Sequence, residues 1–163
     1  MLDIFLTRPD DLNRAVELDP GHAWAIAARG EVYQAMQRYD EAVADFSRAV
    51  ELDPSQKLAF AWRGQVYSRM KRYDQALADF NRAVELDPGY AWGFASRGDT
   101  YRQMKQYDQA LADFNRAVEL DPGEYWAIGR RGRTYWQMRR YGKALADIKR
   151  LFKLVLSDPP PEI

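Results

Sequence analysis

Apolar residues recur along this chain with the spacing of α-helices, arranged as pairs of helices with short polar turns between them. In one such pair Phe94, Gly98 and Tyr101 stand at i, i+4 and i+7, which places them on one face of a first helix. The second helix is indicated by the same kind of spacing at Tyr107, Ala110, Phe114 and Ala117. The pattern therefore predicts two antiparallel helices joined by a tight turn.

Turn residues mark where the second helix of each pair begins and ends. Asp108 is placed to cap the start of that helix, and Asp40 and Asp74 hold the same place earlier in the chain. The sequence Asp121-Pro122-Gly123 is expected to end it, because proline cannot continue a helix and disfavours the helical conformation of the residue before it. The helix pairs are thus bounded by local chemistry at both ends.

The helix pair is repeated along the chain with a fixed period. Prolines preceded by Glu-Leu-Asp follow one another every 34 residues, at Pro20, Pro54, Pro88 and Pro122. The sequence YDQALADFNRAVELDPG occurs unchanged at 73–89 and at 107–123. Copies at constant spacing are typical of units that stack on one another, whereas a catalytic site is normally assembled once from unlike parts.

Small residues at matching levels predict how the two helices of a pair touch. A glycine lies in the middle of each first helix, where it costs about 1 kcal/mol relative to alanine. An alanine lies at the same level of each second helix. The residues are Gly30, Gly64, Gly98 and Gly132, with Ala42, Ala76, Ala110 and Ala144. A repeated cost of this kind indicates a repeated gain, and we expect close approach of the two helices to supply it.

These residues together resemble the tetratricopeptide repeat family. The family pattern of a large residue followed by Gly, Tyr, Ala, Phe, Ala and Pro is matched by Phe94, Gly98, Tyr101, Ala110, Phe114, Ala117 and Pro122. The resemblance covers about Asp11 to Leu154 and implies an all-α, right-handed superhelical solenoid of antiparallel helix pairs. It divides the chain into an N-terminal segment (1–10), the second helix of a partial repeat (11–22), four repeats (23–56, 57–90, 91–124, 125–158; one domain at 11–158) and a proline-rich tail (159–163).

The chain departs from the family pattern at several places. An arginine precedes each first-helix glycine where the family often has leucine, and the usual turn glycine is replaced by Gln37, Lys71, Lys105 and Arg139. That turn must therefore form without the residue that most easily adopts positive φ. The last repeat lacks the proline and has Ile148 in place of phenylalanine and Leu151 in place of alanine.

The repeated arginine has a repeated acidic counterpart. Arg29, Arg63, Arg97 and Arg131 recur once per unit, as do Asp45, Asp79, Asp113 and Asp147 on the facing helix. A row of phosphate contacts is one interpretation. Because a buried arginine needs an acidic partner, we instead expect ion pairs within each repeat, Arg63 with Asp79 and Arg97 with Asp113.

Differences between the copies concentrate on one stripe. The second and third repeats agree at 24 of 34 positions. The first helices differ at Leu58/Trp92, Trp62/Ser96, Gln65/Asp99 and Arg69/Gln103, which are spaced i, i+4, i+7 and i+11. A stripe that changes while its surroundings repeat is not required for stacking and is available for recognition.

The family resemblance implies that first helices line a concave groove, which would make this stripe a binding surface for a peptide or partner protein. The expected groove residues are Trp24, Ala28, Glu31, Ala35, Leu58, Trp62, Gln65, Arg69, Trp92, Ser96, Asp99, Gln103, Trp126, Arg130, Arg133 and Gln137. Exposed tryptophan and arginine are enriched at binding hot spots. The alternative for Trp24, Trp92 and Trp126 is packing against the preceding turn. Trp62 is the stronger groove candidate, and its replacement by alanine is expected to weaken ligand binding with little loss of stability.

One known use of the family is not expected here. Clamping the terminal carboxylate of a chaperone tail requires Lys and Asn at certain groove positions. Those positions hold Ala27, Glu31, Ala61, Gln65 and Ala95. An acidic ligand group could still be held in another geometry by Arg130 and Arg133.

Charge and composition restrict the remaining function classes. The formal net charge is zero, yet residues 1–56 carry 5 basic and 11 acidic side chains and residues 125–163 carry 9 and 3. Basic and aromatic residues in the last third allow single-stranded nucleic-acid binding as a lesser alternative, which the acidic first third opposes. With no cysteine, no membrane-length apolar run and no signal sequence, a cytoplasmic location without membrane contact is the simplest expectation.

Catalysis, cofactors and metals are not expected. His22 is the single histidine and lies in a turn, so a nucleophile would lack a well-placed base. The acidic residues do not have the spacing of a calcium loop, and no phosphate-binding or dinucleotide glycine motif is present. The chain is therefore predicted not to be an enzyme and to need no cofactor or metal.

The ends of the array suggest self-association. Repeat arrays need polar caps, yet apolar residues gather at both ends. Those singled out are Phe5, Leu12, Leu151, Phe152, Leu154 and Val155. Either the chain is excised from a longer signalling or regulatory protein as a structural module, or the ends cover one another between molecules, with the acidic beginning meeting the basic end.

Overall fold

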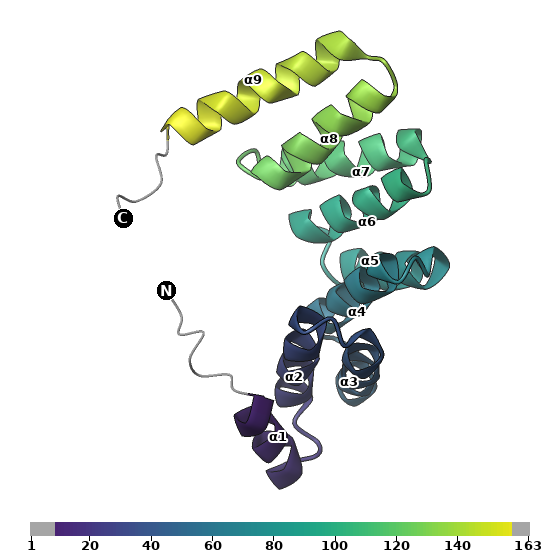
Figure 1. Cartoon of the computed structure of the whole chain (residues 1–163), viewed down its shortest axis with the longest axis vertical. Helices are drawn as coiled ribbons and strands as arrows, with labels where there is room; N and C mark the ends of the chain where they lie inside the picture. Colours follow the sequence, from purple (N-terminus) through teal and green to yellow (C-terminus); the bar gives the residue numbers. More distant parts are fainter. Residues whose placement is uncertain (1–8, 158–163) are drawn as a thin grey trace. The chain divides into compact units, whose positions relative to one another are not determined.

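The computed structural model describes residues 9–157, and this part of the chain is entirely helical, without a β-strand. Its helices form two compact units, of which the N-terminal unit ends at Asp87 and the C-terminal unit begins at Pro88. The N-terminal unit holds α1 (Pro9–Leu18), α2 (Ala23–Ala35), α3 (Tyr39–Leu52), α4 (Lys57–Arg69) and α5 (Tyr73–Leu86). The C-terminal unit holds α6 (Ala91–Gln103), α7 (Tyr107–Leu120), α8 (Tyr125–Gln137) and α9 (Tyr141–Ser157) (Figure 1).

Consecutive helices pack as pairs, as the periodicity predicts. In the N-terminal unit α2 pairs with α3 and α4 with α5, while α1 packs on α2. In the C-terminal unit α6 pairs with α7 and α8 with α9. Within each unit a second helix also packs against the next first helix, α3 on α4 and α7 on α8. Successive pairs inside a unit thus share one continuous set of contacts.

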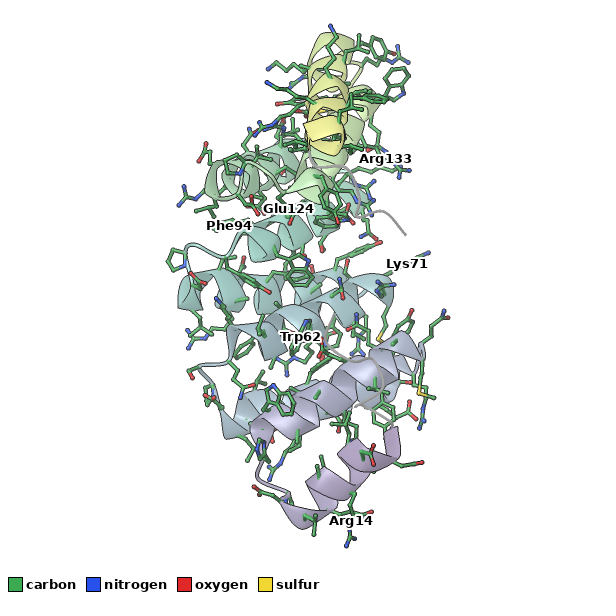
Figure 2. All side chains as sticks on the ribbon, turned by 90° about the vertical axis from the view of Figure 1, so that its left-hand side faces the viewer. Arg14, Trp62, Lys71, Phe94, Glu124 and Arg133 are labelled. Atoms are coloured by element: carbon green, nitrogen blue, oxygen red, sulfur yellow. The ribbon has the colours of Figure 1, made fainter. Side chains whose placement is uncertain are left out.

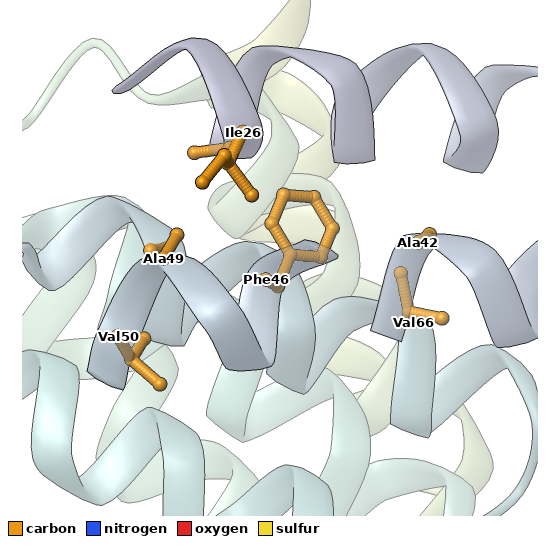
Figure 3. Close-up of a cluster of buried hydrophobic side chains, with 8 residues drawn as sticks. Ile26, Ala42, Phe46, Ala49, Val50 and Val66 are labelled. Carbon is orange, nitrogen blue, oxygen red and sulfur yellow. The ribbon is translucent and has the colours of Figure 1, made fainter. Parts of the chain in front are cut away.

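The core of each unit is built from the apolar positions that the sequence pattern selects. In the N-terminal unit Phe46 is fully buried between α2, α3 and α4, beside Ile26 and Val66 (Figure 3). In the C-terminal unit Val118 and Ile128 belong to the corresponding cluster. Burying one such side chain is worth about 1.5–3 kcal/mol, so each shared cluster ties neighbouring pairs together.

The mid-helix glycines permit close helix approach, which confirms that prediction. A Cβ atom built on Gly98 would lie 3.1 Å from the carbonyl oxygen of Ala110 and 3.1 Å from the Cβ of Asp113. At Gly64 the corresponding distances, to Ala76 and Asp79, are both 3.2 Å. The glycine therefore lets the backbone of the second helix come closer than any larger residue would allow.

The predicted arginine–aspartate pairs are confirmed. The Nε and Nη2 of Arg63 donate to the two carboxylate oxygens of Asp79 at 2.8 and 2.7 Å. Arg97 makes the same two-pronged contact with Asp113 at 2.8 and 2.6 Å. Equivalent pairs join Arg29 to Asp45 and Arg131 to Asp147.

Each arginine also reaches back to the preceding helix pair where both lie in one unit, which the sequence interpretation did not include. The Nη1 of Arg63 donates to Ser47 Oγ on α3 at 3.0 Å. Arg131 donates to Asn115 Oδ1 on α7 at 3.0 Å. The guanidinium groups therefore join three helices, two from their own pair and one from the pair before.

Burial sets the electrostatics of these ion pairs. Hydrogen bonds to Asp79 raise the pKa of the Arg63 guanidinium, against the opposing effect of burial. Burial raises the pKa of the Asp79 carboxyl, because removal from water outweighs the attraction of Arg63. Desolvation thus offsets much of the pair's attraction, and its main contribution is to fix how the helices meet.

The turns within the helix pairs adopt positive φ although they lack the usual glycine. The residues are Gln37 (φ 59°), Lys71 (φ 60°), Lys105 (φ 62°) and Arg139 (φ 58°). The N–H of Arg38 donates to the carbonyl of Tyr33 at 2.9 Å across the first of these turns, the hydrogen bond of a Schellman C-cap. The turn geometry is therefore kept with side chains that disfavour it.

The predicted N-cap aspartates are misplaced by two residues. Helices α3, α5 and α7 begin at Tyr39, Tyr73 and Tyr107, and the residues before these have no side-chain capping hydrogen bond. Asp40, Asp74 and Asp108 instead lie within the first turn. There their charge stabilises the positive end of the helix dipole, which explains an acidic residue at this place without a cap.

Candidate functional site

In the N-terminal unit, the variable stripe runs along α2 and α4, which lie next to each other. Trp24, Glu31, Ala35, Leu58 and Arg69 are exposed, whereas Ala28 is buried. A hydrogen bond from Gln34 Nε2 to Gln65 Oε1 joins the two helices. The two helices therefore present one surface, with amide groups between them, Trp24 and Leu58 near the helix starts and Arg69 at the end of α4.

Trp62 lies at the border of this surface and the core. It is half-buried (Trp62 is labelled in Figure 2) and packs against the cluster around Phe46, with the two ring centroids 6.0 Å apart. Its indole thus serves packing on one side. The expectation that alanine at this place leaves stability nearly unchanged does not fit these contacts.

Glu31 is the acidic residue of this surface. Although the residue is exposed, the surrounding protein displaces some of the water around its carboxyl, and this desolvation raises the pKa of that carboxyl. No hydrogen bond or ion pair is recorded for it within the described residues. A basic or hydrogen-bonding group of a ligand could therefore be met by Glu31.

In the C-terminal unit, the stripe runs along α6 and α8 and is dominated by charge. The carboxylate of Asp99 accepts from Arg102 Nε at 2.8 Å and lies 3.6 Å from Arg130 Nε. Gln103 Nε2 donates to the same carboxylate at 3.2 Å. The Arg130 guanidinium lies over the Trp126 ring, 5.3 Å from its centroid. The two helices are thus joined by one carboxylate held between two guanidinium groups.

Other stripe residues of this unit divide between core and surface. Ser96 is buried, and its hydroxyl has no hydrogen-bond partner within the described residues. Its carbonyl accepts from Thr100 Oγ1 at 3.0 Å. Gln103, Arg133 and Gln137 are exposed (Arg133 is labelled in Figure 2). Ser96 is therefore less accessible than the stripe pattern indicates.

Tryptophans at the starts of the first helices combine both expected roles. Trp24 is 63% exposed and meets the His22 ring edge-on at 6.3 Å between centroids. Trp92 is half-buried beside Tyr90 at 5.9 Å. Trp126 packs against the core cluster of its unit. Contact with the preceding turn therefore occurs for Trp24 and Trp92, and it leaves Trp24 largely accessible.

Sequence reasoning missed one position of the surface. Gln34 and Arg102 occupy the same place in their repeats and bond to Gln65 and Asp99, so they help to build the stripe. The signal was present, because this place holds a different residue in each repeat: Gln34, Ser68, Arg102 and Trp136. It was overlooked because it lies one residue from the stripe.

The nucleic-acid alternative rested on six arginines, and three of these are engaged within the protein. Arg102 and Arg130 contact Asp99, and Arg131 is held by Asp147. The exposed remainder is Arg133, Arg139 and Arg140. The basic surface offered to a nucleic-acid backbone is therefore smaller than the sequence count suggests.

Three further features of the described part of the chain concern its histidine, its metal-ligating side chains and the length of its helices. His22 Nδ1 accepts from the N–H of Ala25 at 3.3 Å, so the histidine acts as a helix cap. Residues 9–157 contain no cluster of three or more side chains able to hold a metal ion. None of their helices is long and apolar enough to cross a bilayer.

The residues predicted for self-association divide between core and surface. Leu12 is 6% exposed, and Leu151 and Leu154 are partly buried against the core cluster of the C-terminal unit. The side chains of these leucines are therefore used, wholly or in part, for packing inside the protein. Phe152 and Val155 are exposed. Phe5 and the tail at 159–163 lie outside the described residues.

Comparison with known proteins identifies the repeat. Three sequence models described as tetratricopeptide repeat match residues 23–56, 57–123 and 96–151. No curated protein sequence matches the chain.

Solved structures show the same fold. MamA from Desulfovibrio magneticus RS-1 is 20% identical, with a TM-score of 0.82 over 93% of this chain and 88% of that chain. Another crystal structure of MamA is 19% identical, with a TM-score of 0.81 over 91% and 87%. The first tetratricopeptide repeat domain of Spaghetti (RPAP3), bound to the HSP90 peptide SRMEEVD, is 27% identical, with a TM-score of 0.66 over 76% and 93%. The fold is that of an all-α repeat solenoid.

Proposed function

Because this chain belongs to the tetratricopeptide repeat family, we propose that it binds peptide segments of partner proteins along the variable stripe of its first helices. Proteins of this family are generally non-catalytic interaction scaffolds. One structural neighbour, Spaghetti, is seen with an HSP90 peptide. Our proposal is that the present chain also acts by holding a partner rather than by catalysing a reaction.

The observation that carries the proposal is the contrast between constant packing residues and changing stripe residues. In the C-terminal unit Asp99 stands at the repeat position of Gln65, and Arg130 stands at the position of Trp62. Packing does not require this change, because Arg63 and Gly64 of α4 make the same contacts with their second helix as Arg97 and Gly98 of α6. The change is therefore best explained by recognition of different ligand groups.

The two units favour different ligand chemistry. The N-terminal unit offers apolar Leu58, half-buried Trp62 and acidic Glu31, which suits an apolar segment with a basic group. The C-terminal unit offers Arg130 stacked on Trp126, which suits an acidic or planar group. The polar positions would select the ligand, and the apolar ones would supply affinity.

The chaperone-tail clamp is not proposed. Ala27, Ala61 and Ala95 occupy places where that clamp needs polar side chains, and all three are almost fully buried. They cannot contact a ligand. A partner other than such a tail is expected, and a cytoplasmic location remains a prediction from composition.

Selection from a random peptide library on the full chain would test the proposal. Selected peptides should lose about tenfold or more in affinity on Leu58→Ser or Arg130→Gln, because hot-spot residues carry most binding energy. Glu85→Gln is a matched control, since Glu85 is exposed on α5, away from the stripe. Equal binding to all variants would reject the stripe as the binding surface.

The structural alternative rests on the exposed residues of α9. A chain that serves only as an oligomerising module would yield no stripe-dependent peptides. It would instead form assemblies that disappear on Phe152→Ser, as measured by sedimentation velocity. Nucleic-acid binding would show as a steep salt dependence of oligonucleotide affinity.

A further inference from the structure

The last helix carries an apolar surface that the described residues leave open. Tyr141, Leu145, Ile148, Phe152 and Val155 recur at i, i+4, i+7, i+11 and i+14 of α9 and are all exposed. Trp136 of α8 extends this surface, because its ring meets Tyr141 edge-on at 5.0 Å between centroids. We name these six residues the end patch.

Three positions of the end patch have buried counterparts one repeat earlier. Leu111, Phe114 and Val118 of α7 are 6%, 0% and 6% exposed. Their counterparts 34 residues later, Leu145, Ile148 and Phe152, are 51%, 40% and 66% exposed. The residue type is apolar in both helices, so the difference arises from what covers them.

A helix covers these positions in the earlier repeat. Helix α8 packs against both α6 and α7, and Ile128 of α8 joins Val118 of α7 in the core cluster. Helices α8 and α9 repeat the arrangement of α6 and α7. The end patch is therefore shaped to seat one further helix in the same manner.

Charge around the end patch specifies that helix further. Residues 125–157 contain nine basic side chains and one acidic side chain, Asp147. Asp147 is held by Arg131 inside the pair. Lys149 and Lys153 are exposed on α9 one turn apart, next to the apolar stripe. A helix seated here meets an apolar strip with a basic margin.

We propose that the end patch binds an amphipathic helix of a partner protein whose apolar face is flanked by Asp or Glu. Burial of the six apolar side chains supplies the affinity, and the lysines select the acidic flank. Five of the six end-patch residues lie on α9, and only Trp136 borders the stripe of the first helices, so this proposal does not depend on the peptide-binding function.

A second copy of this chain is a poorer occupant. Helix α1 is acidic, but its buried Leu12 already faces α2, and Leu18 is its one exposed large apolar residue. Pairing of two α9 helices would match apolar faces but bring Lys149 and Lys153 of both copies together. Neither arrangement combines an apolar face with acidic flanks.

A matched pair of helical probes tests the proposal on the full chain. Both are stapled, fluorescently labelled peptides with the α8 sequence Tyr125–Gln137, the helix that covers α7. One keeps its three arginines, and the other carries Glu at all three. Fluorescence anisotropy should show the acidic probe binding about tenfold or more tightly at low salt, with the difference shrinking at about 0.5 M salt.

Three variants assign the binding to the end patch. Phe152→Glu should abolish binding of the acidic probe, and Leu18→Glu, an equally exposed apolar site on α1, should leave it unchanged. The double change Lys149→Glu and Lys153→Glu keeps the apolar strip and should reverse the preference toward the basic probe. Circular dichroism confirms that each variant remains helical.

Several outcomes would overturn the proposal. Equal affinity for both probes would reject the preference for acidic flanks. Absence of binding by either probe would reject the end patch as a helix-binding site. Dimerisation in sedimentation velocity that is lost in Phe152→Glu would assign the patch to a second copy. Probe binding that appears only after deletion of residues 1–8 would assign it to the chain's own N-terminal segment.

Discussion

The second helices α5 and α7 have the same fourteen residues, whereas the first helices α4 and α6 share only five of thirteen. In both second helices the central Asp, Phe and Ala are almost fully buried. The five residues that the first helices share include Arg63 and Gly64, which contact the second helix. Contact with the partner helix therefore fixes residue identity, and the stripe of the first helix is left to vary.

The largest expected effect is the loss of a buried phenylalanine from a second helix. Phe114→Ala should cost about 3–5 kcal/mol of unfolding free energy, because the ring is fully buried and a cavity remains. Leu58→Ala, on the stripe and 41% exposed, should cost less than about 1 kcal/mol. Urea denaturation measures both, and similar costs would contradict the division between the two kinds of helix.

Replacement of the ion-paired arginine of the first helix should destabilise the protein, as replacement of a buried second-helix residue does. Arg63→Ala leaves the carboxylate of Asp79 buried without its partner and should cost about 3 kcal/mol. Arg69→Ala, an exposed arginine of the same helix, is the control and should change stability by less than about 0.5 kcal/mol. If the two arginines proved equivalent, the ion pair would have no structural role.

Trp62 lies on the variable stripe and also packs against the core. Trp62→Ala should cost about 2 kcal/mol, because half of the indole packs against Phe46 and its neighbours. Trp24→Ala, whose side chain is mostly exposed, should cost far less. Thermal and urea unfolding of the two variants would decide whether Trp62 belongs to the core or to the stripe.

The smallest expected effect is a gain at the turns. Lys71→Gly should stabilise the protein by about 0.5–1 kcal/mol, because glycine adopts φ of 60° without the strain of a side chain, partly offset by its greater freedom when unfolded. Lys71→Ala keeps the strain and serves as the control. A loss of stability with glycine would show that the Lys71 side chain compensates for the turn conformation.

Most of the fold followed from sequence because its determinants repeat. The helix pairs, the close approach at Gly98 and the pairing of Arg63 with Asp79 depend on contacts made once per unit, which periodicity reveals. The start of α7 was misplaced because an acidic residue stabilises either a cap or a first turn, and composition does not separate these roles.

The candidate site was predicted less completely because exposure depends on neighbours. Trp24 and Trp62 are the same residue type on the same stripe, yet one is exposed and the other contacts Phe46. The cluster around Asp99 joins residues from two helices, α6 and α8. The spacing of residues within one helix does not show which of them lie opposite residues of the other helix. The buried state of Ser96 has the same origin.

The guanidinium groups that join three helices also bear on how the array comes apart. Arg63 links the first helix of its repeat to the second helix through Asp79, and to the repeat before it through Ser47. In a linear array, stability is approximately the sum of terms for each unit and terms for each junction. One arginine side chain therefore contributes to the stability of its unit and to that of a junction. Unfolding of one repeat also removes a contact of its neighbour. Local unfolding is therefore expected to extend to neighbouring repeats instead of remaining within one helix pair.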